Sequence, residues 1–137
     1  MGRKTRNRAS GGFTLVEMLI VVAIIAVLVM VSIPLVSASL EDAREAADAA
    51  NERAAKSAAM ASYLLAGKSD AAFYGYKADG TVQEVSDDIQ LASLGGEGYD
   101  YGQSQGKKDR YVGVSIIYES DGTLQIETQW YLNKSGL

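Results

Sequence analysis

The 137-residue chain carries 13 lysines and arginines against 17 aspartates and glutamates, a formal net charge of −4. It contains no histidine and no cysteine, so disulfides, thiolate metal sites and the commonest nucleophile and base pairs are excluded. This composition indicates neither an enzyme, nor a cofactor site, nor a basic surface for nucleic acid.

Residues 1–12 form a basic leader. Arg3, Lys4, Arg6 and Arg8 occur there without any acid, and such a cluster stays on the cytoplasmic side of a membrane. Without these four cations, nine cations face seventeen acids, a formal charge of −8. We therefore expect a cytoplasmic N-terminus and an acidic C-terminal part outside the membrane.

An apolar segment follows at residues 13–35, and the chain has no charged residue from Met18 to Leu40. About twenty apolar residues in a helix cross a hydrocarbon core, and only a helix pairs every backbone group of a single segment in lipid. No second run of this kind follows, which predicts one crossing. A cleaved secretory signal is the alternative, with Ser37–Ser39 as its cleavage site, but a carboxylate at Glu17 argues against it.

Glu17 lies near the start of the apolar segment. The string GFTLVEMLIVVAIIAVL, with the basic leader before it and Pro34 after it, resembles the type IV prepilin signal. Type IV pilins share this signal with the pseudopilins of type II secretion and DNA uptake. The resemblance implies cleavage between Gly12 and Phe13 and methylation of the new amine of Phe13. It also implies that Glu17 pairs with that amine on a neighbouring subunit during assembly. Pro34 is expected to kink the helix.

The resemblance also implies a set of partners and a location. The partners are a prepilin peptidase that is also the N-methyltransferase, an inner-membrane assembly platform, and other copies of this chain or related pilins. The chain would cross the cell membrane once and then enter a filament at the cell surface. The implied fold is α+β and pilin-like, with one long N-terminal helix packed against a small antiparallel sheet.

Residues 36–66 are predicted to continue the same helix in water, because alanine, glutamate, arginine and lysine dominate them. Gly67 is a plausible stop, and two pairs, Arg44 with Asp48 and Glu52 with Lys56, have the spacing for surface ion pairs. Small and apolar residues recur every three or four positions, and we expect the rest of the chain to cover this stripe. A homomeric coiled coil is the alternative. The stripe comprises Leu40, Ala43, Ala47, Ala50, Ala54, Ala58, Ala61 and Leu65.

Residues 67–137 are predicted to form a small β-rich head domain. Residues 110–132 read as a hairpin that turns at Asp121-Gly122, and residues 71–85 as a weaker one that turns at Asp79-Gly80. A short helix behind a Ser86 cap is expected between them. One face of the hairpin at residues 110–132 should pack on the alanine stripe. That face would carry Val112, Val114, Ile116, Tyr118, Leu124, Ile126 and Trp130.

A short basic cluster and four aspartates are explained by loop and turn structure and do not indicate a binding site. Lys107, Lys108 and Arg110 read as a solvated loop, and the aspartates at 87, 88, 100 and 121 fit turns and caps better than a calcium loop. We therefore expect no metal.

The sequence thus predicts a structural subunit of a type IV pilus-like filament. A pseudopilin of a type II secretion or DNA-uptake system is the alternative within this class. A different class is an uncleaved, membrane-anchored sensor or binding protein whose aromatic side chains line a ligand site. Those side chains would be Phe73, Tyr74, Tyr76, Tyr99, Tyr101, Tyr111 and Tyr118.

Overall fold

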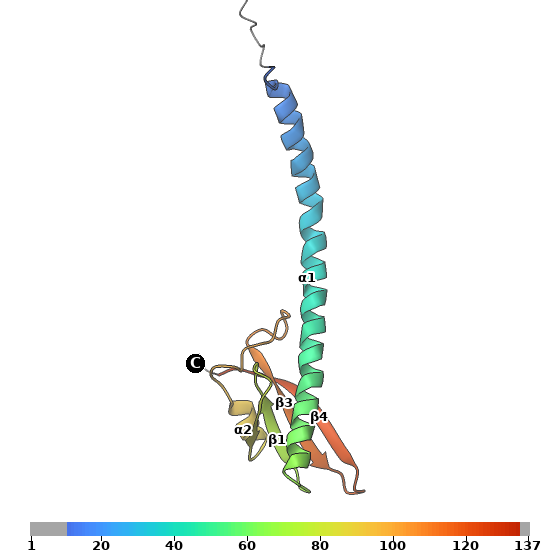
Figure 1. The fold of residues 1–137 in the computed structure, drawn as a ribbon, viewed down its shortest axis with the longest axis vertical. Coiled ribbons are helices and arrows are strands. Elements are labelled where there is room, and N and C mark those ends of the chain that lie inside the picture. The colour runs from blue at the N-terminus through green and yellow to red at the C-terminus, as the bar shows by residue number, and fades with distance from the viewer. Residues whose placement is uncertain (1–10, 135–137) are drawn as a thin grey trace, which may run out of the picture. The chain divides into compact units, whose positions relative to one another are not determined.

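The computed structural model describes residues 11–134, and Figure 1 labels their helices and strands. The predicted basic leader lies outside this range except for Gly11 and Gly12. The elements in chain order are α1 (Leu15–Leu65), β1 (Ala72–Tyr76), β2 (Val82–Val85), α2 (Asp88–Ser93), β3 (Arg110–Tyr118) and β4 (Leu124–Leu132). One long N-terminal helix and a small antiparallel sheet confirm the expected α+β, pilin-like fold.

The chain divides into two compact units after Ser39, inside α1. The first unit contains residues 15–39 of the helix, whose large apolar side chains are all exposed. By length and composition, this helix could cross a membrane. α1 continues through Pro34, which has no backbone N–H to donate to the carbonyl four residues earlier. The predicted kink at Pro34 stays a prediction.

The second unit contains residues 40–65 of α1 and the four-stranded sheet, whose strand order is β2-β1-β3-β4. All three strand pairs are antiparallel. Both predicted hairpins are present, and their turns use the expected glycines at positive φ, Gly80 and Gly122. In each turn an aspartate, Asp79 or Asp121, accepts a hydrogen bond from the backbone N–H of the threonine two residues later. The predicted turn chemistry is therefore confirmed.

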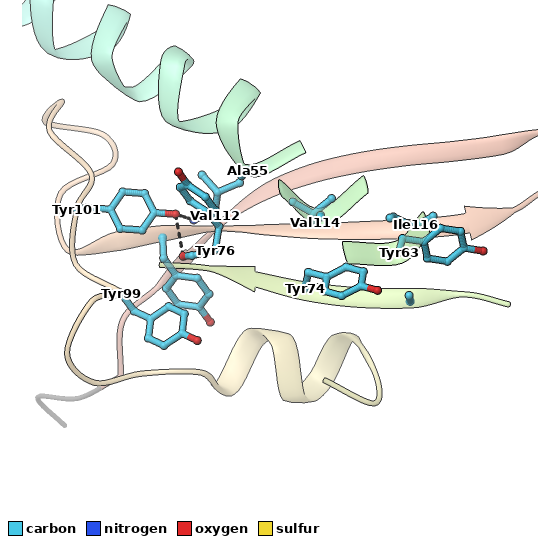
Figure 2. Close-up of a cluster of buried hydrophobic side chains, with 12 residues drawn as sticks. Ala55, Tyr63, Tyr74, Tyr76, Tyr99, Tyr101, Val112, Val114 and Ile116 are labelled. Atoms are coloured by element: carbon cyan, nitrogen blue, oxygen red, sulfur yellow. Dashed lines mark hydrogen bonds between the residues drawn. The ribbon is translucent and has the colours of Figure 1, made fainter. Parts of the chain in front are cut away.

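The sheet has helices on both faces. On one face, Val112, Val114 and Ile116 of β3 pack with Ala55 and Ala59 of α1. Figure 2 shows Ala55 and Tyr63 of the helix in the same cluster as these strand residues. On the other face, a Cβ added to Gly113 would meet Leu91 of α2 at 2.9 Å. The sheet is thus the middle layer of the second unit, with little room for larger side chains.

The hairpin face predicted to pack on the helix is largely correct. Val112, Val114 and Ile116 are fully buried, and Leu124, Ile126 and Trp130 of β4 are partly buried against the same cluster. Tyr118 is the exception, because it lies at the end of β3 and is 43% exposed.

The predicted packing face of the helix, in contrast, is wrong. The α1 residues buried against the sheet are Ala55, Ala59 and Tyr63, and Asp48 is buried against the segment before β3. Asp48, Ala55 and Ala59 each lie one residue after a member of the predicted stripe. One residue corresponds to about 100° around a helix. Every member of the predicted stripe is exposed except Ala58, which is partly buried. Because alanine occurs on both faces of this helix, small size alone did not distinguish them. The alanine stripe is therefore an outer surface of the second unit.

The helix ends confirm one prediction and correct another. At the end of α1, Gly67 has φ 61°, its N–H donates to Leu64, and the N–H of Lys68 donates to Tyr63, which is the Schellman pattern. At the start of α2 the cap is Asp87, whose carboxylate accepts from the Gln90 N–H, and not the predicted Ser86. Serine and aspartate are both good N-cap residues, and in α2 the aspartate occupies the N-cap position.

Candidate processing and assembly site

Thr14 and Glu17 form a reciprocal hydrogen-bonded pair at the start of α1. The Thr14 backbone N–H donates to Glu17 Oε2 over 2.9 Å, and the Glu17 backbone N–H donates to Thr14 Oγ1 over 3.1 Å. This arrangement is a capping box, in which an N-cap threonine and a glutamate three residues later satisfy each other's free amide groups. Glu17 thus has a role within its own chain, and the sequence pattern Thr-x-x-Glu before an apolar run could have revealed it.

Gly12 and Phe13 lie just before the capping box, outside the helix. Phe13 is 82% exposed, and a Cβ added to Gly11 or Gly12 would meet no atom within 4 Å. The backbone on both sides of the Gly12–Phe13 peptide bond is therefore open in the described residues. The structure places Phe13 and Glu17 in one short segment, whereas Pro34 lies about five turns further along α1.

A second polar cluster, which sequence reasoning missed, joins α1 to the segment before β3. Asp48 Oδ1 accepts from the Gln103 N–H over 2.8 Å, and Asp48 Oδ2 accepts from the Ser104 N–H over 2.9 Å and from Ser104 Oγ over 2.6 Å. About two helical turns earlier, Glu41 Oε1 accepts from the Gln105 N–H over 2.7 Å. These two carboxylates hold residues 103–105 on the helix.

Asp48 is fully buried, yet it is kept ionised by its partners. Burial pushes the pKa of this carboxyl up, but the Ser104 hydroxyl, the Gln103 and Ser104 amides and the charge of Lys107 outweigh burial and hold the pKa below its ordinary value. A buried carboxylate with three donors is a structural anchor.

This anchor corrects the predicted ion pairs. Asp48 is bonded to the loop and not to Arg44, and Arg44 instead pairs with Glu41 at 3.4 Å. Glu52 accepts from Thr128 Oγ1 of β4 over 3.0 Å, and no ion pair joins it to Lys56 within residues 11–134. Spacing on the helix surface could not predict the partners of Asp48 and Glu52, because those partners come from distant parts of the chain.

The tyrosines form the core of the second unit. Tyr74, Tyr76, Tyr99, Tyr101 and Tyr111 are buried, with the Tyr76 and Tyr101 rings edge to face at 5.9 Å. Tyr101 Oη donates to the Tyr76 carbonyl and accepts from the Val112 N–H, as Figure 2 shows. Side chains predicted to line a ligand site in the alternative class are thus packed against one another.

The basic cluster is only partly solvated. Lys108 is exposed, whereas Lys107 Nζ lies over the Trp130 ring, 5.0 Å from its centroid. Within residues 11–134, no three histidine, cysteine, aspartate or glutamate side chains are grouped to hold a metal ion.

Comparison with known proteins adds one match, at the N-terminus. The family model of the prokaryotic N-terminal methylation motif matches residues 7–33, the stretch that includes Gly12, Phe13, Thr14 and Glu17. No curated protein and no solved structure matches the chain. From Thr14 on, the matched segment is the capped, apolar start of α1, and α1 belongs to an α+β fold of pilin-like layout. The chain therefore carries the N-terminal methylation motif that is the signal of type IV pilins and pseudopilins.

Proposed function

We propose that this protein is a structural subunit of a type IV pilus-like filament. It is made as a precursor with a cytoplasmic N-terminus, cut between Gly12 and Phe13, and methylated on Phe13. Its apolar helix holds it in the membrane until the assembly platform moves it into the filament. The observation that carries this proposal is the methylation motif on a helical segment, residues 15–39, whose large apolar side chains are all exposed.

The exposure of this helix supports assembly by helix packing. An apolar surface of this size is not stable in water, so it needs lipid at first and other helices after extraction. Head-to-tail contacts that do not close into a ring generate open helical polymers. The exposed alanine stripe of residues 40–65 extends the same logic into the second unit, because small side chains let another helix approach closely.

We propose that Glu17 sets the position of one subunit relative to the next by pairing with the amine of the neighbouring Phe13. Its Oε2 atom accepts from Thr14, and the positive amine created at Phe13 of a neighbouring copy is a stronger partner for the carboxylate than any neutral donor. A charge at this position of an apolar segment is costly without such a partner.

The N-terminal peptide tests the proposal directly. Protein sheared from the cell surface and protein left in the membrane are digested separately, and the masses of the N-terminal peptides are measured by mass spectrometry. A peptide that begins at methylated Phe13 in the sheared fraction is expected. The same peptide confined to the membrane fraction would favour a pseudopilin, and an intact MGRKTRNR terminus on all the protein would exclude processing.

Glu17→Gln tests the ion pair separately from the cap. Glutamine keeps an oxygen that can accept from Thr14 but has no charge, so we expect a cleaved protein that accumulates in the membrane with little or no sheared filament. Filaments at the wild-type level would contradict the ion pair.

A further inference from the structure

The outer edge of β4 is a long strand edge that has no partner strand within residues 11–134. β4 is the last strand in the order β2-β1-β3-β4 and pairs only with β3. The strand at the other edge, β2, has four residues, whereas β4 has nine. Sheets usually protect a long edge with proline, lysine or a β-bulge. β4 contains neither proline nor lysine, and its nine pairs with β3 are consecutive, so this edge is open to another strand.

The hydrogen-bond register shows which backbone groups of β4 face the open edge. At the two ends of the β3–β4 pair, the Asn133 N–H donates to the Asp109 carbonyl and the Glu119 N–H donates to the Thr123 carbonyl. Bonded and non-bonded pairs alternate along an antiparallel ladder, so the odd-numbered residues of β4 are bonded to β3. The even-numbered residues direct their N–H and C=O groups outward, and the described part of the chain supplies no hydrogen bond to them. They are Leu124, Ile126, Thr128, Trp130 and Leu132.

The side chains of the same even-numbered residues form an apolar row on the sheet face that α1 covers. Leu124, Ile126 and Trp130 are only partly buried against the core cluster, and Leu132 is 49% exposed. Thr128, in the middle of the row, donates its hydroxyl to Glu52 of α1. Open backbone groups and half-covered apolar side chains therefore occur on the same residues, which is the surface that an added strand uses.

We propose that the open edge of β4 binds the β4 edge of a second copy of this chain, antiparallel and centred on Thr128. Pairs of apolar side chains, and of an aromatic with a β-branched one, stabilise adjacent strands. Glu127 is the one charged residue of β4, and in this register it lies opposite a glutamine, so no like charges of the two strands are directly opposite. This self-complementarity favours a second copy as the partner. The opposed pairs are Thr128 with Thr128, Ile126 with Trp130, Leu124 with Leu132, Glu127 with Gln129 and Gln125 with Tyr131.

The symmetry of this pairing fixes how the two copies are arranged. A two-fold axis perpendicular to the sheet at Thr128 joins the two sheets into one and leaves residues 40–65 of both α1 helices on the same face. Strands are about 4.8 Å apart, so the two β3 strands, three spacings apart, leave about 14 Å for helices that need roughly 8–10 Å. The axis also reverses the direction of α1. Because all subunits of the proposed filament point the same way, the contact goes beyond that function and joins subunits of two filaments.

Glu52 limits the strength of this contact. Each Thr128 holds one Glu52 carboxylate, so pairing at Thr128 brings the two Glu52 side chains toward each other, and like charges repel. Glu52→Gln keeps an oxygen that can accept from Thr128 and removes both charges. This substitution should therefore increase the pairing of the two copies.

Single cysteines test the pairing, because the chain has none of its own. The detergent-solubilised full chain is oxidised mildly, and the disulfide-linked dimer is measured over time. Thr128→Cys lies on the axis, where the two Cα atoms should be about 5.5 Å apart, within the range of a disulfide. Gln125→Cys is the matched control on the same strand: it is exposed, and its counterpart should be about 20 Å away.

We expect Thr128→Cys to form the dimer at least about tenfold faster than Gln125→Cys, and faster still when Glu52→Gln is added. Equal rates for the two cysteines would show random collision or a parallel register. No dimer from either cysteine would show that this edge stays single or takes a different partner. Slower cross-linking with Glu52→Gln would contradict the placement of the axis at Thr128.

Each of these three results would overturn the inference and leave the proposed function intact, since processing at Phe13 does not involve β4. An intact N-terminus on all the protein would instead overturn the proposed function without affecting the pairing of β4.

Discussion

The first and second units of this molecule use their apolar side chains in opposite ways. In residues 15–39 the large apolar side chains are exposed, and the segment has no core of its own. In residues 40–134 the core is closed, built on tyrosines, small residues and the strands of one sheet. The first unit therefore leaves its apolar surface uncovered, whereas the second covers its own through contacts within the unit.

Alkaline pH should separate the two units most strongly. Burial raises the pKa of Tyr111 to about 12 and that of Tyr101 beyond this. A group whose pKa is raised on folding contributes stability that is complete below its unfolded pKa, near 10, and is lost as the pH rises toward the folded value. The second unit should therefore unfold above pH 10.

This loss of structure can be followed in the detergent-solubilised full chain. Trp130 is the only tryptophan and lies 5.9 Å from the Tyr101 ring, so its fluorescence reports on the core. Residues 15–39 contain no tyrosine, and their helical circular dichroism should persist. Unchanged Trp130 fluorescence up to pH 12 would contradict the prediction.

Asp48→Asn should destabilise the second unit by about 3 kcal/mol, because a buried carboxylate with three donors is replaced by an amide that can accept fewer of them. In the wild type, the lowered pKa of Asp48 means that its contribution is present above pH 4 and is lost as the pH falls further. The variant should lose this acid-dependent part of the stability.

Urea unfolding followed by Trp130 fluorescence between pH 3 and pH 7 measures both effects. Asp42→Asn is the matched control, since Asp42 is exposed on the same helix. Equal urea midpoints for the two variants would show that the Asp48 anchor contributes little.

The neighbouring alanines Ala54 and Ala55 give the sharpest test of the helix faces. Ala55 is fully buried and Ala54 is exposed. Ala55→Leu should cost about 2 kcal/mol by overpacking. Ala54→Leu should change the stability of the second unit by less than about 0.5 kcal/mol but should reduce filament yield if the stripe packs on another copy. The opposite pattern in urea unfolding would show that the faces are assigned wrongly.

Sequence reasoning reached the features that depend on local chemistry. The apolar helix, the two glycine turns and the Gly67 stop each follow from a few adjacent residues, and the structure has all of them. The N-terminal motif is equally local, which is why the family model matches it. The hairpin face also follows, since alternation along β3 separates its two sides.

Features that depend on contacts between residues far apart in the sequence could not be predicted from the sequence. The burial of Asp48 is set by Gln103 and Ser104, more than fifty residues away. The packing face of the helix was missed because alanines lie all around it, and the residue that marks the buried row, Tyr63, stands near its end. The capping box, in contrast, was available from Thr14 and Glu17 and was overlooked because the carboxylate was assigned to another subunit.

The turn between β3 and β4 is also a place where foreign sequence could be carried. Residues 119–123 are exposed and close on themselves through hydrogen bonds between Glu119 and Thr123 and between Thr123 and Asp121. Lengthening an exposed loop costs little, since closure entropy grows only slowly with length. An epitope or a fluorophore-binding peptide inserted after Asp121 would keep both strand registers and would label the second unit.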